Sequence, residues 1–311
     1  MRFGRERPEI VRPPSEWRSY YLPITWGCSH AGCAFCRWYG EKLRIRDLEE
    51  IEEEIRALSL LRNHGVYAPS LHPVAARIAI EWDGRRIFLQ DADALAYPYE
   101  SLVEILKALR EHFPSLERVG SYATPQILLR RSVEQLRKLR ELGLGILYVG
   151  VESGDDLVLE KVGKGVRSEE IVEACRKVKE AGIALSVTVI LGLGGKERSR
   201  EHALRTAEVL SRIDPEFAAA LTLMIVPGTP LEREVQEGRF SLLSPFEILE
   251  ELKLMLENCD FSSFFSTMHA SNYLPLRGRF PQEKGKLLSI LEEVLRRRDP
   301  GLLRPSFLRA L

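Results

Sequence analysis

Three cysteines, Cys28, Cys33 and Cys36, stand within nine positions near the start of the chain. Three thiolates at this spacing can converge on one metal centre. They would leave one iron of a 4Fe–4S cubane without a protein ligand, and an open coordination position is what a catalytic centre needs. The alternative is a structural zinc site in which His30 completes the ligand set.

Carboxylates follow two other apolar runs of the sequence. Asp91 and Asp93 come after Arg86–Gln90, and Glu152 comes after Ile146–Val151. A carboxylate can accept hydrogen bonds from an ammonium group or from two vicinal hydroxyls. Because an unpaired buried carboxylate is costly, Glu152 at the end of an apolar run favours a ligand-binding role. The alternative for the two aspartates is that they form or cap a turn.

Other candidates stand where further strands are predicted to end. Ser121 and Thr124 follow a third apolar run and could reach a ligand or belong to a turn. Gly192 and Gly194 follow Leu185–Leu191, and glycine permits close approach of the backbone to a flat ligand.

A last group of polar residues, His269, Asn272 and Tyr273, follows the final predicted strand. These side chains could bind a substrate or deliver a proton, and they are our predicted catalytic residues. The alternative is a turn that closes the barrel, with His269 as a structural histidine.

The elements that must position these residues alternate along the chain. Short β-branched or apolar runs alternate with amphipathic stripes such as Leu48, Ile51, Ile55 and Leu58. The predicted strands are Tyr20–Thr25, Arg86–Gln90, Arg118–Ser121, Ile146–Val151, Leu185–Leu191, Ala219–Val226 and Phe264–Met268. This alternation predicts an α/β fold, a partial (β/α)6-type TIM barrel with parallel strands and a C-terminal helical extension. Active sites of such barrels lie on the loops that follow the strands.

The predicted organisation has three parts. Residues 1–18 form an N-terminal extension, residues 19–268 form the barrel core, and residues 269–311 form a C-terminal extension that covers the barrel. A helix is expected at about Gln282–Arg297 in that extension. The segment Asn63–Gly84 fits the alternation poorly, and we interpret it as an insertion before the second strand.

The cysteine loop resembles that of the radical S-adenosylmethionine (radical SAM) superfamily, which places three cysteines after its first strand and an aromatic residue, here Phe35, before the last one. The segments Tyr148–Gly154 and Lys161–Gly165 resemble the branch with the tRNA methylthiotransferases and the Elongator-type catalytic subunit. Val226–Pro230 resembles coproporphyrinogen-oxidase-like members. Two departures stand out: four residues rather than three separate the first two cysteines, and Asp91-Ala92-Asp93-Ala94 replaces Gly-Gly-Glu-Pro.

The resemblance implies cofactors and roles. The three cysteines would hold a 4Fe–4S cluster, whose open iron binds the methionine part of S-adenosylmethionine. Asp93 would receive the methionine amino group, Glu152 the ribose hydroxyls, and Val226 would form a wall for adenine. The implied cofactor-binding residues are Phe35, Asp91, Asp93, Ser121, Thr124, Glu152, Gly192, Gly194 and Val226.

Composition narrows the function classes. Lys+Arg and Asp+Glu both total 45, so the net charge is zero and gives no general electrostatic reason to bind nucleic acid or a membrane surface. No apolar run reaches the length of a membrane span, and the N-terminus does not resemble a signal peptide. We therefore expect a cytoplasmic protein, in which thiols stay reduced and cysteines more often bind metal than form disulfides.

The sequence thus predicts an oxygen-sensitive radical SAM enzyme. Its cluster would cleave S-adenosylmethionine to a 5′-deoxyadenosyl radical, which abstracts hydrogen from an organic substrate. The expected partners are a small-molecule or unidentified substrate and a reductant such as ferredoxin or flavodoxin. Two alternatives stay open: an RNA-modifying radical SAM enzyme, and a non-enzymatic protein with a structural zinc or iron–sulfur site.

Overall fold

The computed structural model describes residues 2–3 and 7–310, and contacts between residues group the chain into two compact units. The first unit takes the residues up to Ala31 together with 40–148 and 177–184, and the second takes 32–39, 149–176 and 185 onward. Strand β7 (Leu144–Glu152) and helix α7 (Ser168–Glu180) contribute to both units. The predicted three-part division at residues 18 and 268 stays a prediction.

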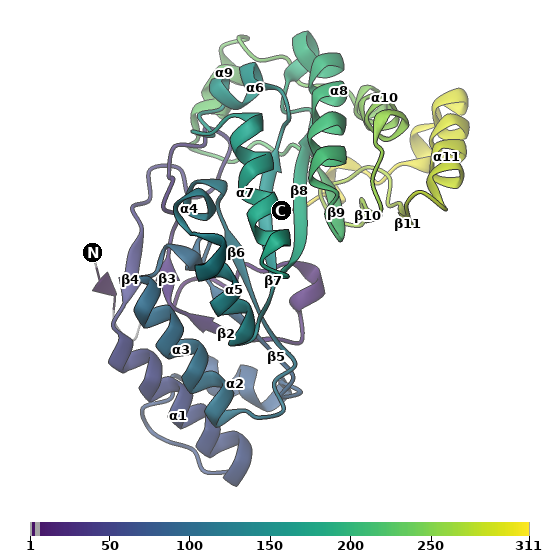
Figure 1. Cartoon of the computed structure of the whole chain (residues 1–311). Coiled ribbons are helices and arrows are strands. Elements are labelled where there is room, and N and C mark those ends of the chain that lie inside the picture. The colour runs from purple at the N-terminus through teal and green to yellow at the C-terminus, as the bar shows by residue number, and fades with distance from the viewer. Residues whose placement is uncertain (1, 4–6, 311) are drawn as a thin grey trace. The chain divides into compact units, whose positions relative to one another are not determined.

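The first unit is built on parallel strands. Strand β5 lies between β2 and β6, and the first part of β7 follows β6. The strands are β2 (Tyr20–Pro23), β5 (Arg86–Gln90) and β6 (Arg118–Ala123). The helices are α1 (Leu48–His64), α2 (Pro73–Glu81), α3 (Tyr99–His112), α4 (Pro125–Arg130) and α5 (Val133–Glu141). Helix α1 packs against α2 and α3, which Figure 1 shows together in purple and blue.

A small second sheet belongs to the same unit. Strand β4 (Arg44–Arg46) lies between β1 (Arg2–Phe3), to which it is parallel, and β3 (Thr25–Trp26), to which it is antiparallel. Strand β3 directly precedes the segment 27–43, which holds the three cysteines, and β4 follows it, so the pairing of β3 with β4 joins the two ends of this segment.

The second unit continues the same scheme. The end of β7 is followed in the sheet by β8 (Ala184–Leu191), β9 (Phe217–Thr222) and β10 (Phe264–Ser266), while β11 (Arg277–Arg279) is antiparallel to β10. Its helices besides α7 are α6 (Asp156–Lys161), α8 (Gly195–Ile213), α9 (Pro230–Gln236), α10 (Pro245–Asn258) and α11 (Lys284–Arg297). Helix α10 packs against both α8 and α11.

Local sequence signals explain where these elements begin and end. Helix α5 begins with a capping box, in which Ser132 and Gln135 satisfy each other's backbone amides. The chain after it turns at Gly143 with a φ of 108°, a conformation that glycine adopts without steric cost. Along β8 the side chains alternate between buried and partly buried, as the period of a strand requires.

One predicted strand is wrong at its end. The sequence predicts a strand through Val226, but β9 stops at Thr222. Thr222 pairs with Leu191, the last residue of β8, and Gly192 then turns the chain away with a φ of 81°. Residues 223–226 therefore have no neighbouring strand there to extend, and Val226 does not stand at a strand end as predicted.

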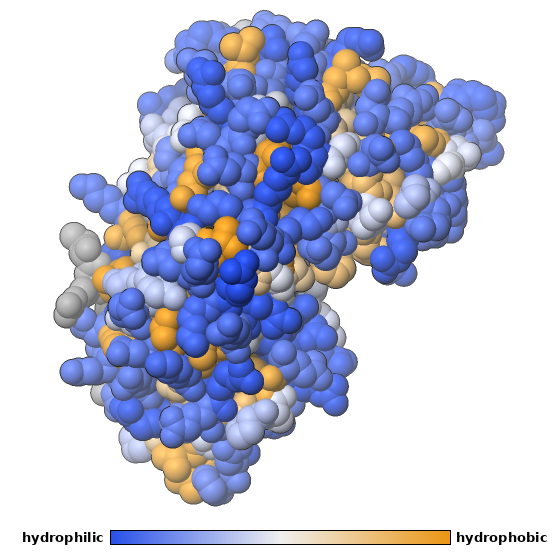
Figure 2. All heavy atoms as spheres, viewed as in Figure 1, coloured by the Kyte–Doolittle hydropathy of each residue, from blue (hydrophilic) through white to orange (hydrophobic). Residues whose placement is uncertain are grey.

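The fold class is as predicted: an α/β fold with a mostly parallel sheet and helices between the strands. Within the described residues no helix has the length and apolar character needed to cross a membrane. The face shown in Figure 2 is mainly hydrophilic, with apolar side chains in scattered patches.

Candidate functional site

The first half of the cysteine loop is tied to the residue that follows β5. Gly27 has a φ of 86°, and its amide donates to Asp91 Oδ2 at 3.1 Å. The Asp91 amide in turn donates to Thr25 Oγ1 at 2.9 Å. The backbone next to Cys28 is therefore fixed by the carboxylate predicted from the sequence.

The second carboxylate, Asp93, is fully buried and lies among hydroxyls. Its Oδ2 accepts hydrogen bonds from the Ser29 hydroxyl and from Thr124 Oγ1, the latter at 2.9 Å, and its Oδ1 accepts from the Thr124 amide at 3.2 Å. Burial raises the pKa of Asp93, while these hydrogen bonds and Arg131 act in the opposite direction. The structure thus brings together the predicted residues Asp93 and Thr124 and joins them to the cysteine loop through Ser29.

The second half of the loop belongs to the second unit. The Ala34 amide donates to the Val162 carbonyl at 2.8 Å, and the Ala34 carbonyl accepts from the Leu231 amide at 3.0 Å. Phe35 packs against an apolar core cluster of this unit. Gly163, with a φ of 67°, approaches the loop so closely that a Cβ there would lie 2.6 Å from the Gly32 carbonyl oxygen. The segment Lys161–Gly165 and the beginning of α9 therefore hold this part of the loop.

An ion pair lies beside the second cysteine. Lys164 Nζ is 3.0 Å from Glu152 Oε1, and both side chains are largely buried. Burial raises the pKa of Cys33 to about 11; the Lys164 charge lowers it, and the charges of Glu152 and Cys36 raise it. Burial likewise raises the pKa of Cys36, whose amide donates to the Cys33 carbonyl at 3.1 Å. The predicted ribose ligand therefore shares an environment with two predicted cluster ligands.

The three thiols of the loop are donors of the type that iron–sulfur clusters use. All five cysteines are free, with Cys33 buried and Cys28 and Cys36 partly buried. In the described part of the chain no three His, Cys, Asp or Glu side chains are already gathered as a ligand group. Cys175 and Cys259 are buried by packing, and burial raises the pKa of each to about 12, as expected for core thiols.

Several residues that were predicted to contact the cofactor make hydrogen bonds or close contacts within the protein instead. The buried Ser121 hydroxyl donates to the Tyr122 carbonyl at 2.8 Å. The Gly192 amide donates to Glu251 Oε1 at 2.6 Å, and a Cβ at Gly192 would lie 2.8 Å from a methyl of Ile248. These contacts give Gly192 a packing role between β8 and α10.

Two further predicted positions also have structural contacts. Gly194 is the N-cap of α8, and a Cβ there would lie 3.1 Å from the Cβ of His202. The Val226 carbonyl accepts from Thr229 Oγ1 at 2.7 Å, in the turn that begins α9.

The predicted catalytic group is integrated into the second unit. Asn272 is buried; its Nδ2 donates to the carbonyls of Ala220 at 2.8 Å and Thr267 at 3.0 Å, and its Oδ1 accepts from Thr222 Oγ1 at 2.9 Å. Every hydrogen-bonding atom of the amide side chain thus has a protein partner, as in the structural alternative.

The neighbours of Asn272 are held in a similar way. His269 Nδ1 is 2.9 Å from Ser271 Oγ, and burial lowers the pKa of His269. The Tyr273 hydroxyl accepts from Arg309 Nη1 at 2.5 Å, and the same guanidinium lies 4.1 Å from the centre of the Tyr273 ring.

Sequence reasoning missed Ser29 and Lys164 as members of the site. The serine was visible as a hydroxyl directly after Cys28, and the lysine stood inside the segment already singled out by resemblance. Their partners could not be predicted from the sequence. Ser29 contacts Asp93, and Lys164 contacts Glu152, only because the fold brings these residues together.

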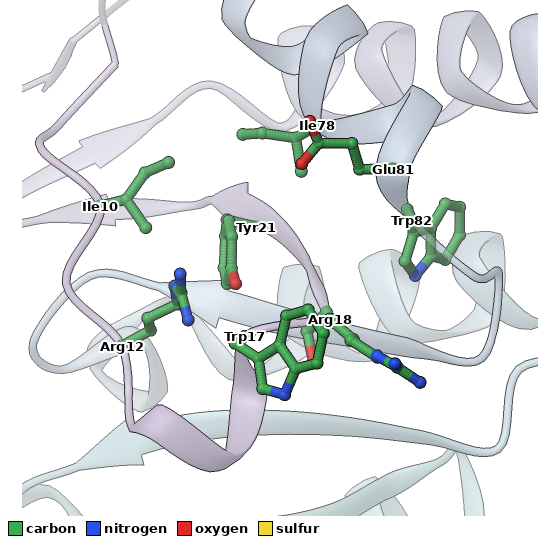
Figure 3. Close-up of a pocket in the computed structure, with 9 residues that line it drawn as sticks. Ile10, Arg12, Trp17, Arg18, Tyr21, Ile78, Glu81 and Trp82 are labelled. Atoms are coloured by element: carbon green, nitrogen blue, oxygen red, sulfur yellow. The ribbon is translucent and has the colours of Figure 1, made fainter.

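A cavity of about 300 Å³ lies elsewhere in the first unit, between the N-terminal segment, the start of β2 and the end of α2 (Figure 3). Arg12, Trp17, Tyr21 and Trp82 are among its lining residues. It adjoins the beginning of β2, whereas Asp91 and Thr124 follow the ends of strands. This cavity is therefore not the candidate site.

Comparisons with known proteins agree with this picture. Residues 73–209 match the radical SAM superfamily. An uncharacterized protein of Methanocaldococcus jannaschii is 29% identical over 257 residues, which are 79% of this chain and 71% of that protein. The heme chaperone HemW of Bacillus subtilis is 27% identical over 145 residues, 46% of this chain and 37% of HemW.

The solved structure of coproporphyrinogen III oxidase from Escherichia coli, a radical SAM enzyme, has the same type of fold, with a TM-score of 0.55 and 19% identity. The match covers 77% of this chain and 52% of the oxidase, so the chain spans only part of the oxidase and of HemW. The cofactors predicted from the cysteine loop, a 4Fe–4S cluster and S-adenosylmethionine, are those of the superfamily. Over residues 73–209 the chain thus matches the radical SAM superfamily, in agreement with its motifs and its fold.

Proposed function

We propose that this enzyme cleaves S-adenosylmethionine reductively and uses the product to abstract hydrogen from an organic substrate. Cys28, Cys33 and Cys36 would hold the 4Fe–4S cluster. When bound, the cluster supplies the electron that splits S-adenosylmethionine into methionine and a 5′-deoxyadenosyl radical. The protein's own contribution is to bind the cofactors and the substrate, to orient them, and to exclude water.

The observation that carries this proposal is the environment of Cys33. The charges of Glu152 and Lys164 act on its thiol, so the predicted ribose ligand lies near two of the predicted cluster ligands, Cys33 and Cys36, in the second unit. A structural zinc site has no need of a buried ion pair beside its ligands, whereas a site for S-adenosylmethionine needs both a hydroxyl acceptor and groups that balance charge.

Asp93 supports a matching role in the first unit. Its carboxylate is held by Ser29 and Thr124, and burial favours its neutral form. A bound ammonium would favour the ionised carboxylate and strengthen their mutual hydrogen bond. Asp93 would therefore accept from the methionine amino group, with Ser29 linking that contact to the cysteine loop.

Lys164 would hold the Glu152 carboxylate in place before the cofactor arrives. Its Nζ occupies one carboxylate oxygen, Oε1, at 3.0 Å. Oε2 has no hydrogen bond of its own in the described structure. One carboxylate can serve both a cation and ribose hydroxyls, since its two oxygens offer about four acceptor positions.

The substrate is proposed only as an organic molecule, and the electron donor as an external reductant such as ferredoxin or flavodoxin. The zero net charge does not favour RNA as the substrate. The cytoplasm suits the reduced thiols of the loop. For Asn272 the contacts support the structural role better than the catalytic one, so we propose no catalytic step for it.

The test is anaerobic reconstitution followed by reduction in the presence of S-adenosylmethionine. We expect slow formation of 5′-deoxyadenosine and methionine even without substrate. Deuterated candidate substrates would then be screened for label transferred to 5′-deoxyadenosine. A protein that binds only zinc, or that carries the cluster without cleaving S-adenosylmethionine, would contradict the proposal.

A further inference from the structure

The backbone at Glu152 adopts an unusual conformation. Glu152 has a φ of 64°, in the left-handed region that non-glycine residues rarely enter. The Ser153 amide donates to the Val151 carbonyl across it at 2.8 Å, so the strand ends in a tight three-residue turn. The other described non-glycine residues with positive φ, Asp214 and Arg298, are helix C-caps, where this conformation is common. Glu152 is not at a helix end, so its surroundings must hold it.

The next three residues are each tied to one face of helix α8. The pairs are Ser153 with His202, Gly154 with Thr206, and Asp155 with Arg198. Arg198, His202 and Thr206 recur every four positions, so their side chains lie along the same side of the helix. The turn after Glu152 is thus fastened at three successive residues to one rigid element.

The central fastening is between Ser153 and His202, both almost completely buried. His202 Nε2 is 3.1 Å from the Ile190 carbonyl, which can only accept, so Nε2 carries the hydrogen. His202 Nδ1 is then the acceptor for the Ser153 hydroxyl at 2.8 Å. The same Ser153 oxygen accepts from the Asp155 amide at 3.0 Å. With the ring in this tautomer, the Ser153 hydroxyl has both an acceptor and a donor partner.

The contacts of Gly154 and Asp155 also restrict the backbone of this turn. The Gly154 amide donates to Thr206 Oγ1 at 2.9 Å, and a Cβ at Gly154 would lie 2.2 Å from the Arg205 carbonyl oxygen. Asp155 Oδ2 accepts from Arg198 Nε and Nη2 at 2.9 and 2.7 Å. Only glycine fits between Ser153 and Asp155, because the turn rests directly on the helix backbone.

We propose that His202, acting through Ser153, is a positioning residue that holds Glu152 in its left-handed conformation and so aims its carboxylate at S-adenosylmethionine. This inference rests on the proposed role of Glu152 as ribose ligand. When the Ser153–His202 hydrogen bond is lost, the turn can relax toward ordinary backbone angles, and the Glu152 carboxylate leaves its binding position.

The test is a double-mutant cycle on the cluster-loaded protein, with the dissociation constant of S-adenosylmethionine as the readout. Ser153→Ala should weaken binding about tenfold, within the range of coupling between residues that act together. In a Glu152→Ala background, Ser153→Ala should change the affinity by less than about twofold. Equal effects of Ser153→Ala in both backgrounds would overturn the proposal. A residue that acts only through general stability has the same effect on the affinity whether or not Glu152 is present.

Substitutions of His202 provide a second route. His202→Leu keeps the approximate volume but removes the acceptor, and it should weaken binding as Ser153→Ala does. His202→Asn places an amide oxygen near the position of Nδ1 and should restore at least part of the affinity. If the His202→Asn variant binds S-adenosylmethionine no better than the His202→Leu variant, although both fold and carry the cluster, the hydrogen bond to Ser153 is not what positions Glu152.

Ser263→Ala is the matched control, because Ser263 is an equally buried serine of the second unit whose hydroxyl donates to the Pro215 carbonyl. It should lower thermal stability without changing the affinity. If Glu152→Ala itself leaves the affinity unchanged, the proposed function of Glu152 fails. If Glu152→Ala weakens binding but the cycle is additive, only the positioning role of His202 fails.

Discussion

Lys164 Nζ lies 3.0 Å from Oε1 of Glu152, the last residue of β7, which stands twelve positions earlier in the chain. The pair places a cation and an anion next to Cys33, whose thiol responds to both charges. A carboxylate in such a pair can still accept hydrogen bonds from hydroxyl groups, since its two oxygens offer about four acceptor positions.

Replacing Glu152 by Ala should weaken the binding of S-adenosylmethionine and leave the cluster intact. Losing one charged hydrogen-bond partner costs about 1.5–3 kcal/mol, or about ten- to a hundredfold in affinity. Equilibrium dialysis on the anaerobic, cluster-loaded protein measures the change. Glu160→Ala is the control, since Glu160 is exposed on the adjacent helix α6. Unchanged affinity in the Glu152 variant would remove it from the ribose role.

The cluster should depend on three cysteines and no others. Reconstituted protein should bind about four irons and four sulfides per chain, and changing Cys28, Cys33 or Cys36 to Ala should abolish this. Cys175→Ala and Cys259→Ala should retain the iron, because both thiols are buried in packing. Iron and sulfide analysis checks each variant. Loss of iron in the Cys175 variant, in a protein that is still folded, would argue against this ligand set.

The elements that carry these residues followed from the sequence where the hydrophobic period was regular. Strand β5 has the predicted bounds, Arg86–Gln90, and α11 begins at Lys284, close to the predicted Gln282. Helix α2 was missed inside the supposed insertion, although Pro73 at its first position is a typical start signal; its N-cap, His72, is not one of the residues that usually mark a helix start. Its apolar stripe is too short to stand out by periodicity alone.

The candidate site was predictable by residue type but not by partner. Asp93 and Glu152 could be chosen because they follow apolar strands, whereas their contacts with Thr124 and Lys164 join residues far apart in sequence. Gly192 shows the converse: a glycine after a strand suggested access for a ligand, but its amide is used by Glu251 from α10. Sequence patterns place a residue at a strand end without saying what fills the space beside it.

Asp93 should make stability depend on pH. Burial raises its pKa above the usual value of 3.8, so the folded protein holds the proton longer than the unfolded chain does. The contribution of Asp93 to stability is therefore most favourable below that value and declines as the pH rises through its raised pKa. Urea unfolding of the cluster-free protein at several pH values measures this. Asp93→Asn should flatten the decline, and an unchanged pH profile would contradict the raised pKa.

The same variant separates the binding role of Asp93 from its effect on stability. Asn cannot offer a negative charge to an ammonium group, so Asp93→Asn should weaken S-adenosylmethionine binding about tenfold or more. Asp260→Asn is a suitable control, because Asp260 is an exposed carboxylate remote in sequence from the cysteine loop. Full affinity in Asp93→Asn would mean that another group receives the methionine amino group.

Asn272→Ala should act on stability rather than on chemistry. It removes an amide that donates to the carbonyls of Ala220 and Thr267 and accepts from Thr222, and leaves three buried polar groups unsatisfied. Each such group costs about 1–3 kcal/mol, so the free energy of unfolding should fall by about 3 kcal/mol or more. The ratio of 5′-deoxyadenosine to product should stay normal in the protein that folds. Asn272→Asp, which keeps the acceptor for Thr222 but loses the two donors, should be destabilised as well. A variant with wild-type stability whose 5′-deoxyadenosine formation is uncoupled from product would return Asn272 to the substrate site.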